Sequence, residues 1–447
     1  QLRNWGLINV KREPWGKFGK GWEVQKNYAA ITIPYYHPII SVPKAWTPGT
    51  NGPFKGEVMI LKIDSAADLD KYKGKLQGKA IMLDVDNKLS PSFHADAARY
   101  TDTALVLMSK VIARPQFMKP MPMPMELMAV FQKMFFKQSL GSFFKAEGAG
   151  LVLSIAHGTD GTVFTSNGAS YDDSAALVAP ELETSGEDYL RILRLVKSGQ
   201  KVEIEADIKT QFFTDDMQGY NVVAEIPGKD KKLKEQLVML GGHLDSWHGA
   251  TGATDNAAGC AVVMEAVRIL KAINFKPKRT IRIVLWSGEE QGMIGSRNYV
   301  RKHFGDAKTL VIKPGQAKVS AYYNLDNGTG KIRGIWLQKN NDARPIFQAW
   351  LNPFKDLGAS TVAIENTGAT DHISLDAVGI PAFQFIQDPV DYGSRTHHTN
   401  QDTYDRLVED DLKQAATIMA SFVYHTAQRK EMIPRKEMPK ETGMVAY

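Results

Sequence analysis

The chain has 447 residues, of which 43% are hydrophobic and 23% are charged. These values are typical of folded proteins and exclude a wholly disordered or fibrous chain. The length is too great for one ordinary core, so we expect two or more domains. Lys and Arg number 55 against 49 Asp and Glu, a net charge of +6. Because the basic residues are scattered, we expect no nucleic-acid partner.

Cysteine content and hydropathy restrict the chain further. Its single cysteine, Cys260, excludes an internal disulfide framework and a multi-cysteine metal site. The sequence has no apolar run of about 20 residues, so we expect no membrane span. The first residues, QLRNWGLINVKREPWG, contain no signal-peptide core. We therefore expect that any targeting segment has been removed.

Residues 44–209 differ from the rest of the chain in their sequence pattern. Short β-like runs alternate there with glycine and polar turns, which predicts a separate, mostly β domain with a few helices. The runs are Val58–Ile63, Ala80–Asp84, Leu105–Met108, Gly150–Ile155 and Lys201–Ile208. Within this region, residues 114–144 are rich in Met, Pro and Phe, and an amphipathic helix is expected over Met125–Leu140.

From Tyr220 onward, predicted strands alternate with predicted helices. This rhythm indicates an α/β fold, in which a mixed or parallel sheet has helices on both faces. The strands are expected at Gln236–Gly242, Thr280–Ser287, Val319–Asp326 and Ile380–Ile386, and the helices at Ala257–Ile273, Gly292–His303 and Asp410–Gln428.

Possible metal ligands follow the predicted strands of this region. His243 and Asp245 come after the first strand, Glu289 and Glu290 after the second, and Asp326 ends the third. His397 and His398 follow the fourth strand, and Asp255 opens the helix after the first. In an open α/β sheet, groups beyond the carboxyl ends of the strands converge. Two imidazoles with several carboxylates and no thiolate suit one or two Zn²⁺ ions, with Mn²⁺ or Co²⁺ as substitutes.

Each ligand type also suggests a role. Asp255 is our choice for the carboxylate that bridges two ions. In His243-x-Asp245 the carboxylate can orient the imidazole. Of the adjacent pair Glu289 and Glu290, one can coordinate while the other takes a proton from water. Taken singly, each pattern also fits an ordinary surface or helix-end position; their coincidence at four strand ends favours a metal centre.

Six motifs occur in an order that resembles the co-catalytic di-zinc exopeptidase family, which contains leucyl aminopeptidases and glutamate carboxypeptidase. The resemblance is strongest to its carboxypeptidase Q, or plasma glutamate carboxypeptidase, branch. The motifs are GGHLDSW, ATDNAAG, LWSGEEQGMIGS, NLDNGTG, TDHISLDAVGIPAFQFIQDP and THHTNQDTYD.

The resemblance implies a zinc-exopeptidase-like mixed sheet flanked by helices. It also implies a discontinuous catalytic domain at 1–43 and 210–447, with a protease-associated domain inserted at 44–209. Family members have a further segment before Trp5, so a preceding helix and signal segment are expected, and with them a secreted or periplasmic location.

The resemblance also assigns roles to residues. It implies one zinc on His243 and Asp326, a second on Glu290 and His398, and Asp255 between them. It favours His398 over His397, because His398-Thr399-x-x-Asp402-Thr403 fits the family pattern, and it implies a cis peptide bond after Asp255. It further implies that Glu289 is the general base.

The expected activity is hydrolysis of a terminal peptide bond in dipeptides or short peptides. Two alternatives stay open: a catalytically inactive receptor or scaffold, and a single-zinc acyl-transfer enzyme similar to glutaminyl cyclase. Arg395, Asp371 and His372 are candidate substrate contacts, although Arg395 could instead form a surface salt bridge. A homodimer is a further open alternative.

Overall fold

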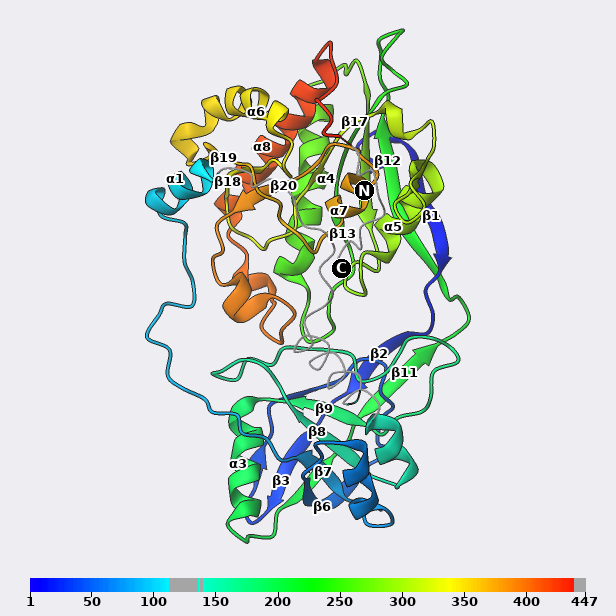
Figure 1. The fold of residues 1–447 in the computed structure, drawn as a ribbon, viewed down its shortest axis with the longest axis vertical. Coiled ribbons are helices and arrows are strands. Elements are labelled where there is room, and N and C mark those ends of the chain that lie inside the picture. Colours follow the sequence, from blue (N-terminus) through cyan, green and yellow to red (C-terminus); the bar gives the residue numbers. More distant parts are fainter. Residues whose placement is uncertain (112–135, 137–139, 438–447) are drawn as a thin grey trace.

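A computed structural model of the chain describes residues 1–111, 136 and 140–437. Most of the Met-rich stretch, including the helix expected over Met125–Leu140, lies outside these residues. Within the described part, two eight-stranded sheets form the centres of a larger and a smaller unit, which lie one above the other in Figure 1.

The larger unit is built on a mixed sheet whose central strands are parallel. Strand β12 pairs antiparallel with both β1 and β14, and β18 pairs antiparallel with β20. In spatial order the strands are β1 (Ile8–Lys17), β12 (Gln218–Ile226), β14 (Thr280–Trp286), β13 (Leu237–His243), β17 (Val319–Asn324), β20 (Ala382–Gln387), β18 (Ile332–Trp336) and β19 (Thr361–Ala363).

Helices cover both faces of this sheet, which explains why its central strands are apolar almost throughout. Val238 and Leu240 of β13 pack in the core that includes α4 (Ala258–Ala272) and α8 (Glu409–Gln428). Met239, on the opposite face, packs with α5 (Ile294–His303) and α7 (His372–Asp376). The alternating strands and helices expected after Tyr220 are confirmed. The helix α6 (Arg344–Leu351) packs beside α8.

The last long helix is closed by a buried arginine from another segment. Arg279 is fully buried and donates from Nη1 to Thr426 O at 3.1 Å and from Nη2 to Lys430 O at 3.0 Å. It also donates to Arg429 O. These carbonyls lie at or just beyond the C-terminal end of α8, where helix carbonyls lack partners within the helix.

The smaller unit has a second mixed sheet covered by α3 (Gly186–Lys197). In spatial order its strands are β4 (His37–Pro38), β3 (Ala29–Ile33), β10 (Glu203–Ala206), β6 (Phe54–Leu61), β7 (Ala80–Leu83), β8 (Leu151–Ile155), β9 (Glu181–Thr184) and β5 (Ser41–Pro43). A ribbon of β2 (Gly21–Lys26) and β11 (Lys209–Phe213) lies between the two units (Figure 1). A short pair, β15 (Gly305–Asp306) and β16 (Val311–Ile312), follows α5.

Two details of the smaller unit differ from the sequence analysis. Strands β3, β4 and β5 precede residue 44 yet pair within the second sheet, so this sheet begins before the expected boundary. The run Leu105–Met108, expected as a strand, lies in a helix, α1 (Asp102–Lys110). Thr101 caps this helix by accepting a hydrogen bond from Ala104 N, and such a cap favours a helix start over a strand.

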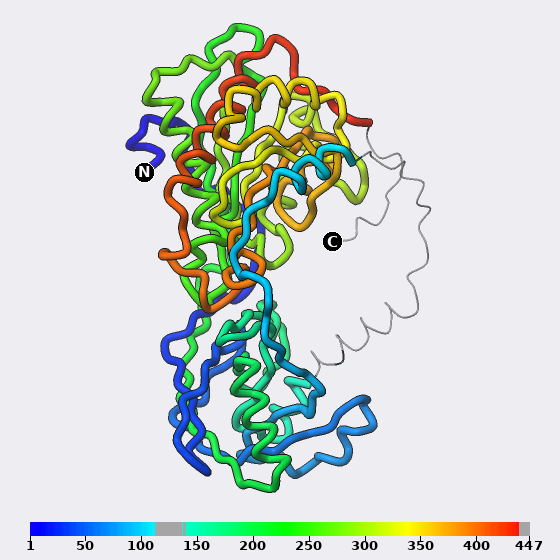
Figure 2. The backbone as a smooth tube through the Cα atoms, turned by 90° about the vertical axis from the view of Figure 1, so that its left-hand side faces the viewer, coloured from blue at the N-terminus to red at the C-terminus, as the bar shows by residue number. Residues whose placement is uncertain are grey.

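Residues 98–110 leave the smaller unit and dock on the larger one, as the cyan segment in Figure 2 shows. Ala98 forms an antiparallel bridge with Val390. The Nη1 of Arg99 donates to Asp388 Oδ2 at 2.9 Å and to Asp411 Oδ2 at 2.6 Å. The helix α1 packs against β19.

No helix in the described ranges is both long and apolar enough to cross a bilayer.

Candidate metal centre

The carboxyl ends of the parallel strands bring the expected ligand residues together. His243 is the last residue of β13, Asp326 follows β17, and Glu289 and Glu290 follow β14. His398 lies on the loop after β20. These ends meet at one edge because the strands are parallel.

Asp255 lies at the middle of this edge, in a π-helical turn, Ala253–Ala257, that leads into α4. Its φ of −126° and ψ of 88° are not helical. The peptide bond between Asp255 and Asn256 is cis, which confirms the expectation from the resemblance.

One group of ligands surrounds His243, whose side chain is only 1% exposed. Its Nε2 lies 3.2 Å from Asp326 Oδ1 and 3.3 Å from Asp255 Oδ1. Glu289 Oε2 is farther away, at 3.9 Å. His243, Asp255 and Asp326 are therefore close enough to hold one ion in common.

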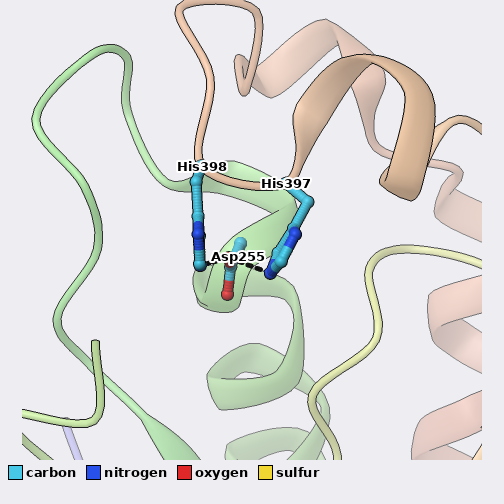
Figure 3. Close-up of side chains that lie close together, drawn as sticks. All are labelled: Asp255, His397 and His398. Carbon is cyan, nitrogen blue, oxygen red and sulfur yellow. Dashed lines mark ion pairs between the residues drawn. The ribbon is translucent and has the colours of Figure 1, made fainter. Parts of the chain in front are cut away.

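A second group surrounds His398. Its Nε2 lies 2.9 Å from Glu290 Oε2 and 3.2 Å from Asp255 Oδ2. His397 Nε2 is 3.8 Å from the same Asp255 oxygen. Figure 3 shows the imidazoles of His397 and His398 on either side of the Asp255 carboxylate. Asp255 thus faces both groups, one through each carboxylate oxygen, as a bridging ligand would.

The cluster carries an excess of negative potential. Burial raises the pKa of Glu289 to about 10, and the nearby Asp371 adds to the effect. Burial also raises the pKa of Glu290, to about 7. Burial lowers the pKa of His398, but Asp255 and Glu290 outweigh it and raise that pKa to about 9. The pKa of Asp255 is instead lowered, because its contacts with His243 and His398 outweigh burial, so the imidazoles stabilise this carboxylate in its charged form.

Two oxygens of the cluster test whether a cation fits. Within the described residues, Asp255 Oδ2 and Glu290 Oε1 are buried and accept no hydrogen bond, although His398 Nε2 lies 3.2 Å from this Asp255 oxygen. A buried carboxylate oxygen without a donor is costly unless a cation lies beside it. Imidazoles and carboxylates are also the donors that Zn²⁺ takes. The residues present therefore fit a metal ion.

Asp245 orients His243, but mainly through its backbone. The Nδ1 of His243 lies 2.9 Å from Asp245 O and 3.8 Å from Asp245 Oδ1. The other carboxylate oxygen accepts from Glu290 N at 3.2 Å. Because Nδ1 faces the carbonyl, Nε2 is left to face the cluster.

Asp402 was not among the expected site residues, yet it supports Asp255 directly. Its carboxylate accepts from Thr254 N at 2.7 Å and from Asp255 N at 3.0 Å. The sequence could have indicated this residue, since Asp402 lies four residues after His398 in the same motif.

The three candidate substrate contacts have different surroundings. Asp371 and His372 are fully buried. His372 Nε2 lies 2.7 Å from Gln338 Nε2, and burial lowers the pKa of His372 to about 4. The guanidinium of Arg395 forms ion pairs with Asp96 at 2.8 Å and Asp160 at 2.9 Å. These contacts favour the salt-bridge alternative for Arg395.

A family profile and related sequences match the part of the chain that carries this site. The profile of Peptidase family M28 matches residues 221–423. Carboxypeptidase Q of Mus musculus is 30% identical over 249 residues, which are 56% of this chain and 50% of that protein. Aminopeptidase YwaD of Bacillus subtilis (strain 168) is 26% identical over 238 residues, 52% of this chain and 49% of that protein. The chain thus spans about half the length of these relatives.

Solved structures match nearly the whole chain. A peptidase M28 precursor from Shewanella amazonensis SB2B has a TM-score of 0.66 at 24% identity and covers 98% of this chain and 88% of its own. A zinc aminopeptidase from Bacillus subtilis has a TM-score of 0.57 at 18% identity, covering 96% and 87%. At these identities the likeness concerns the fold.

Proposed function

We propose that the protein is a zinc-dependent exopeptidase of peptidase family M28, because the profile of that family matches residues 221–423. It hydrolyses a terminal peptide bond in dipeptides or short peptides. The observation that carries the proposal is the position of Asp255 between two groups of ligands, each with one imidazole and one further carboxylate.

The chain would hold two zinc ions. His243 and Asp326 bind one, Glu290 and His398 bind the other, and Asp255 binds both. When bound, zinc supplies Lewis acidity, which polarises a carbonyl group and lowers the pKa of water toward about 7. The two buried oxygens without hydrogen-bond donors, on Asp255 and Glu290, support this assignment.

Glu289 is the general base in this proposal. Its side chain is 10% exposed and 3.9 Å from His243 Nε2, so it stays outside the closest ligand contacts. Burial raises its pKa, and bound cations would lower that pKa again, so that the group could exist as a carboxylate that accepts a proton. A carboxylate oxygen of Glu289 takes a proton from water and then donates it to the leaving amine.

The smaller unit corresponds in this proposal to a protease-associated domain. It contacts the loop that carries His398, since Thr165 N donates to His398 O at 2.7 Å. A unit in this position narrows the approach to the cluster, which favours short peptides over folded proteins. Export from the cytoplasm and formation of a homodimer stay predictions from the sequence.

Two measurements test the proposal. Dipeptides, with N-acetylated and C-amidated forms as controls, are incubated with the chain and added Zn²⁺, and zinc-dependent release of amino acids is expected. The controls identify which terminus must be free. The absence of hydrolysis for every dipeptide would overturn the proposal.

Native mass spectrometry then counts the ions per chain. Two ions are expected. One ion would favour the acyl-transfer alternative, and none would favour the receptor or scaffold alternative.

A further inference from the structure

The loop that carries His398 is paired with a segment of the smaller unit. Phe164 and Thr399 form an antiparallel bridge. On one side of it, Asn400 N donates to Val163 O at 3.1 Å, and Val163 N donates to Asn400 Oδ1 at 2.8 Å. A chain segment from the other unit thus forms a short strand-like partner for the ligand loop.

The backbone of His398 itself is held by Thr165. The carbonyl oxygen of His398 accepts from Thr165 N at 2.7 Å and from Thr165 Oγ1 at 2.9 Å. His398 has a φ of +60°, a left-handed conformation that is uncommon for residues other than glycine. Such a conformation persists when surrounding contacts determine it.

Thr162 holds the loop at two further points. It is fully buried, and its Oγ1 accepts from Arg395 Nη1 at 2.7 Å and from Gln401 Nε2 at 2.9 Å. Arg395 Nη1 also donates to Thr159 O at 2.7 Å. Residues before and after His398 are therefore bound to the same buried hydroxyl.

The other expected ligands are supported within the larger unit. His243 ends a central strand, and the backbone of Asp255 is held by Asp402. His398 differs, because partners from the smaller unit hold its carbonyl and the residues around it. Groups that orient a metal ligand affect metal affinity by about 10–100-fold.

We propose that Thr165 and Thr162 of the smaller unit are positioning residues for His398, so that this unit sets the affinity of the zinc ion held by Glu290 and His398. The inference rests on the proposed function, since it takes His398 as a zinc ligand. It assigns the smaller unit a part in metal binding in addition to limiting access.

The test compares two zinc dissociation constants, measured by competition with a chelator, in Thr165→Val and Thr162→Val. Each variant keeps the shape of the side chain and removes the hydroxyl. We expect one of the two zinc ions to bind about 10–100-fold more weakly while the affinity of the other is unchanged. Thr165→Ser, which keeps the hydroxyl, should restore the affinity.

The matched control is Thr184→Val. Thr184 is a fully buried threonine of the same unit whose Oγ1 has no hydrogen-bond partner among the residues that the structure describes. Removing this hydroxyl should leave both zinc affinities unchanged. Unchanged affinities in Thr165→Val and Thr162→Val, or an equal weakening of both ions, would overturn the inference.

A second measurement does not need zinc. Hydrogen–deuterium exchange of the metal-free chain should be faster across residues 395–401 in Thr165→Val than in Thr184→Val. If the unsubstituted chain bound no zinc, the proposed function would fail. Equal exchange in the two variants would overturn the positioning role separately.

Discussion

Glu289 and Glu290 are neighbours in sequence with different surroundings. The Glu290 side chain is 1% exposed and 2.9 Å from His398 Nε2. The ion-pair contact of Glu289 is longer, with His243 Nε2 at 3.9 Å. We expect Glu289→Gln to lower kcat by about 10²–10⁴-fold, because an amide cannot accept the proton. Steady-state kinetics and metal analysis should show this loss with the zinc content retained.

Glu290→Gln is the matched control for that variant. It should lower the zinc content, because an amide oxygen is a weaker ligand than a carboxylate. Lost zinc in Glu289→Gln with retained zinc in Glu290→Gln would exchange the two roles.

His397 and His398 allow a second comparison within one loop. His397 is 41% exposed and 3.8 Å from Asp255, whereas His398 contacts both Asp255 and Glu290 more closely. We expect His398→Ala to lose one zinc ion and the activity, and His397→Ala to keep both ions and part of the activity. Metal analysis and a dipeptide assay measure these effects. The opposite pattern would mean that His397, and not His398, is the ligand.

Glu13 predicts a pH dependence of stability outside the metal centre. Burial raises its pKa, but hydrogen bonds from Lys302 and His303 outweigh this and lower the pKa from 4.5 to about 2. A carboxyl with a lowered pKa in the folded state stabilises the fold above its unfolded value and loses this effect as the pH falls.

The stability difference between the unsubstituted chain and Glu13→Gln should therefore shrink as the pH falls from 4.5 toward 2. Urea unfolding at several pH values measures it. A difference that does not change with pH would contradict the ion-pair explanation.

At the scale of residues, the sequence predicted the convergence of ligand types because they end parallel strands, and such ends share one edge of a sheet. Thr162 and Thr165 could not be predicted in this way. They lie more than 230 positions from the loop they hold and act on backbone and side-chain groups without a sequence pattern. Arg395 near His398 suggested a substrate contact, but its partners come from the other unit.

Among the elements, the strands and helices after Tyr220 were predictable because long apolar runs alternate with amphipathic helices. The smaller unit was harder. Leu105–Met108 is apolar enough to suggest a strand, but only Leu105 is buried in α1. The pairing of β3 with β10 and of β5 with β9 depends on long-range contacts that residue type does not encode.

The cap of α8 by Arg279 predicts a loss of stability that leaves the metal centre intact. Arg279→Met removes the charged donor from the carbonyls of Thr426, Arg429 and Lys430. Leaving the buried carbonyl of Thr426 unpaired costs about 1–3 kcal/mol, so we expect the unfolding free energy to fall by about that amount.

Denaturant unfolding measures this change, and zinc content provides the control. Because Arg279 contacts the end of a helix and no ligand, the number of bound ions should stay at that of the unsubstituted chain. A change below about 0.5 kcal/mol, which is usual for surface substitutions, would contradict the capping role.

At the scale of the whole molecule, the metal centre lies above cores that are large without it. Both units have extensive clusters of buried apolar side chains. We expect a chelator to abolish peptide hydrolysis while the fold persists, in contrast to a zinc finger, whose metal determines its fold. Far-ultraviolet circular dichroism and activity, followed together before and after zinc is added back, measure this. Loss of both signals at once would contradict it.

The docking of residues 98–110 on the larger unit affects whether the smaller unit can be removed from the chain. Arg99 pairs with Asp388, which is fully buried and also pairs with Arg333 of the larger unit, and with Asp411, which is nearly buried. Deleting residues 44–209 would therefore remove Arg99, which pairs with carboxylates of the larger unit. A single-unit version of this chain would have to retain residues 98–110 or replace Asp411, because Asp388 keeps its ion pair with Arg333. Part of residues 44–209 thus packs against the larger unit. Exchange of the smaller unit between related proteins would have to leave residues 98–110 in place.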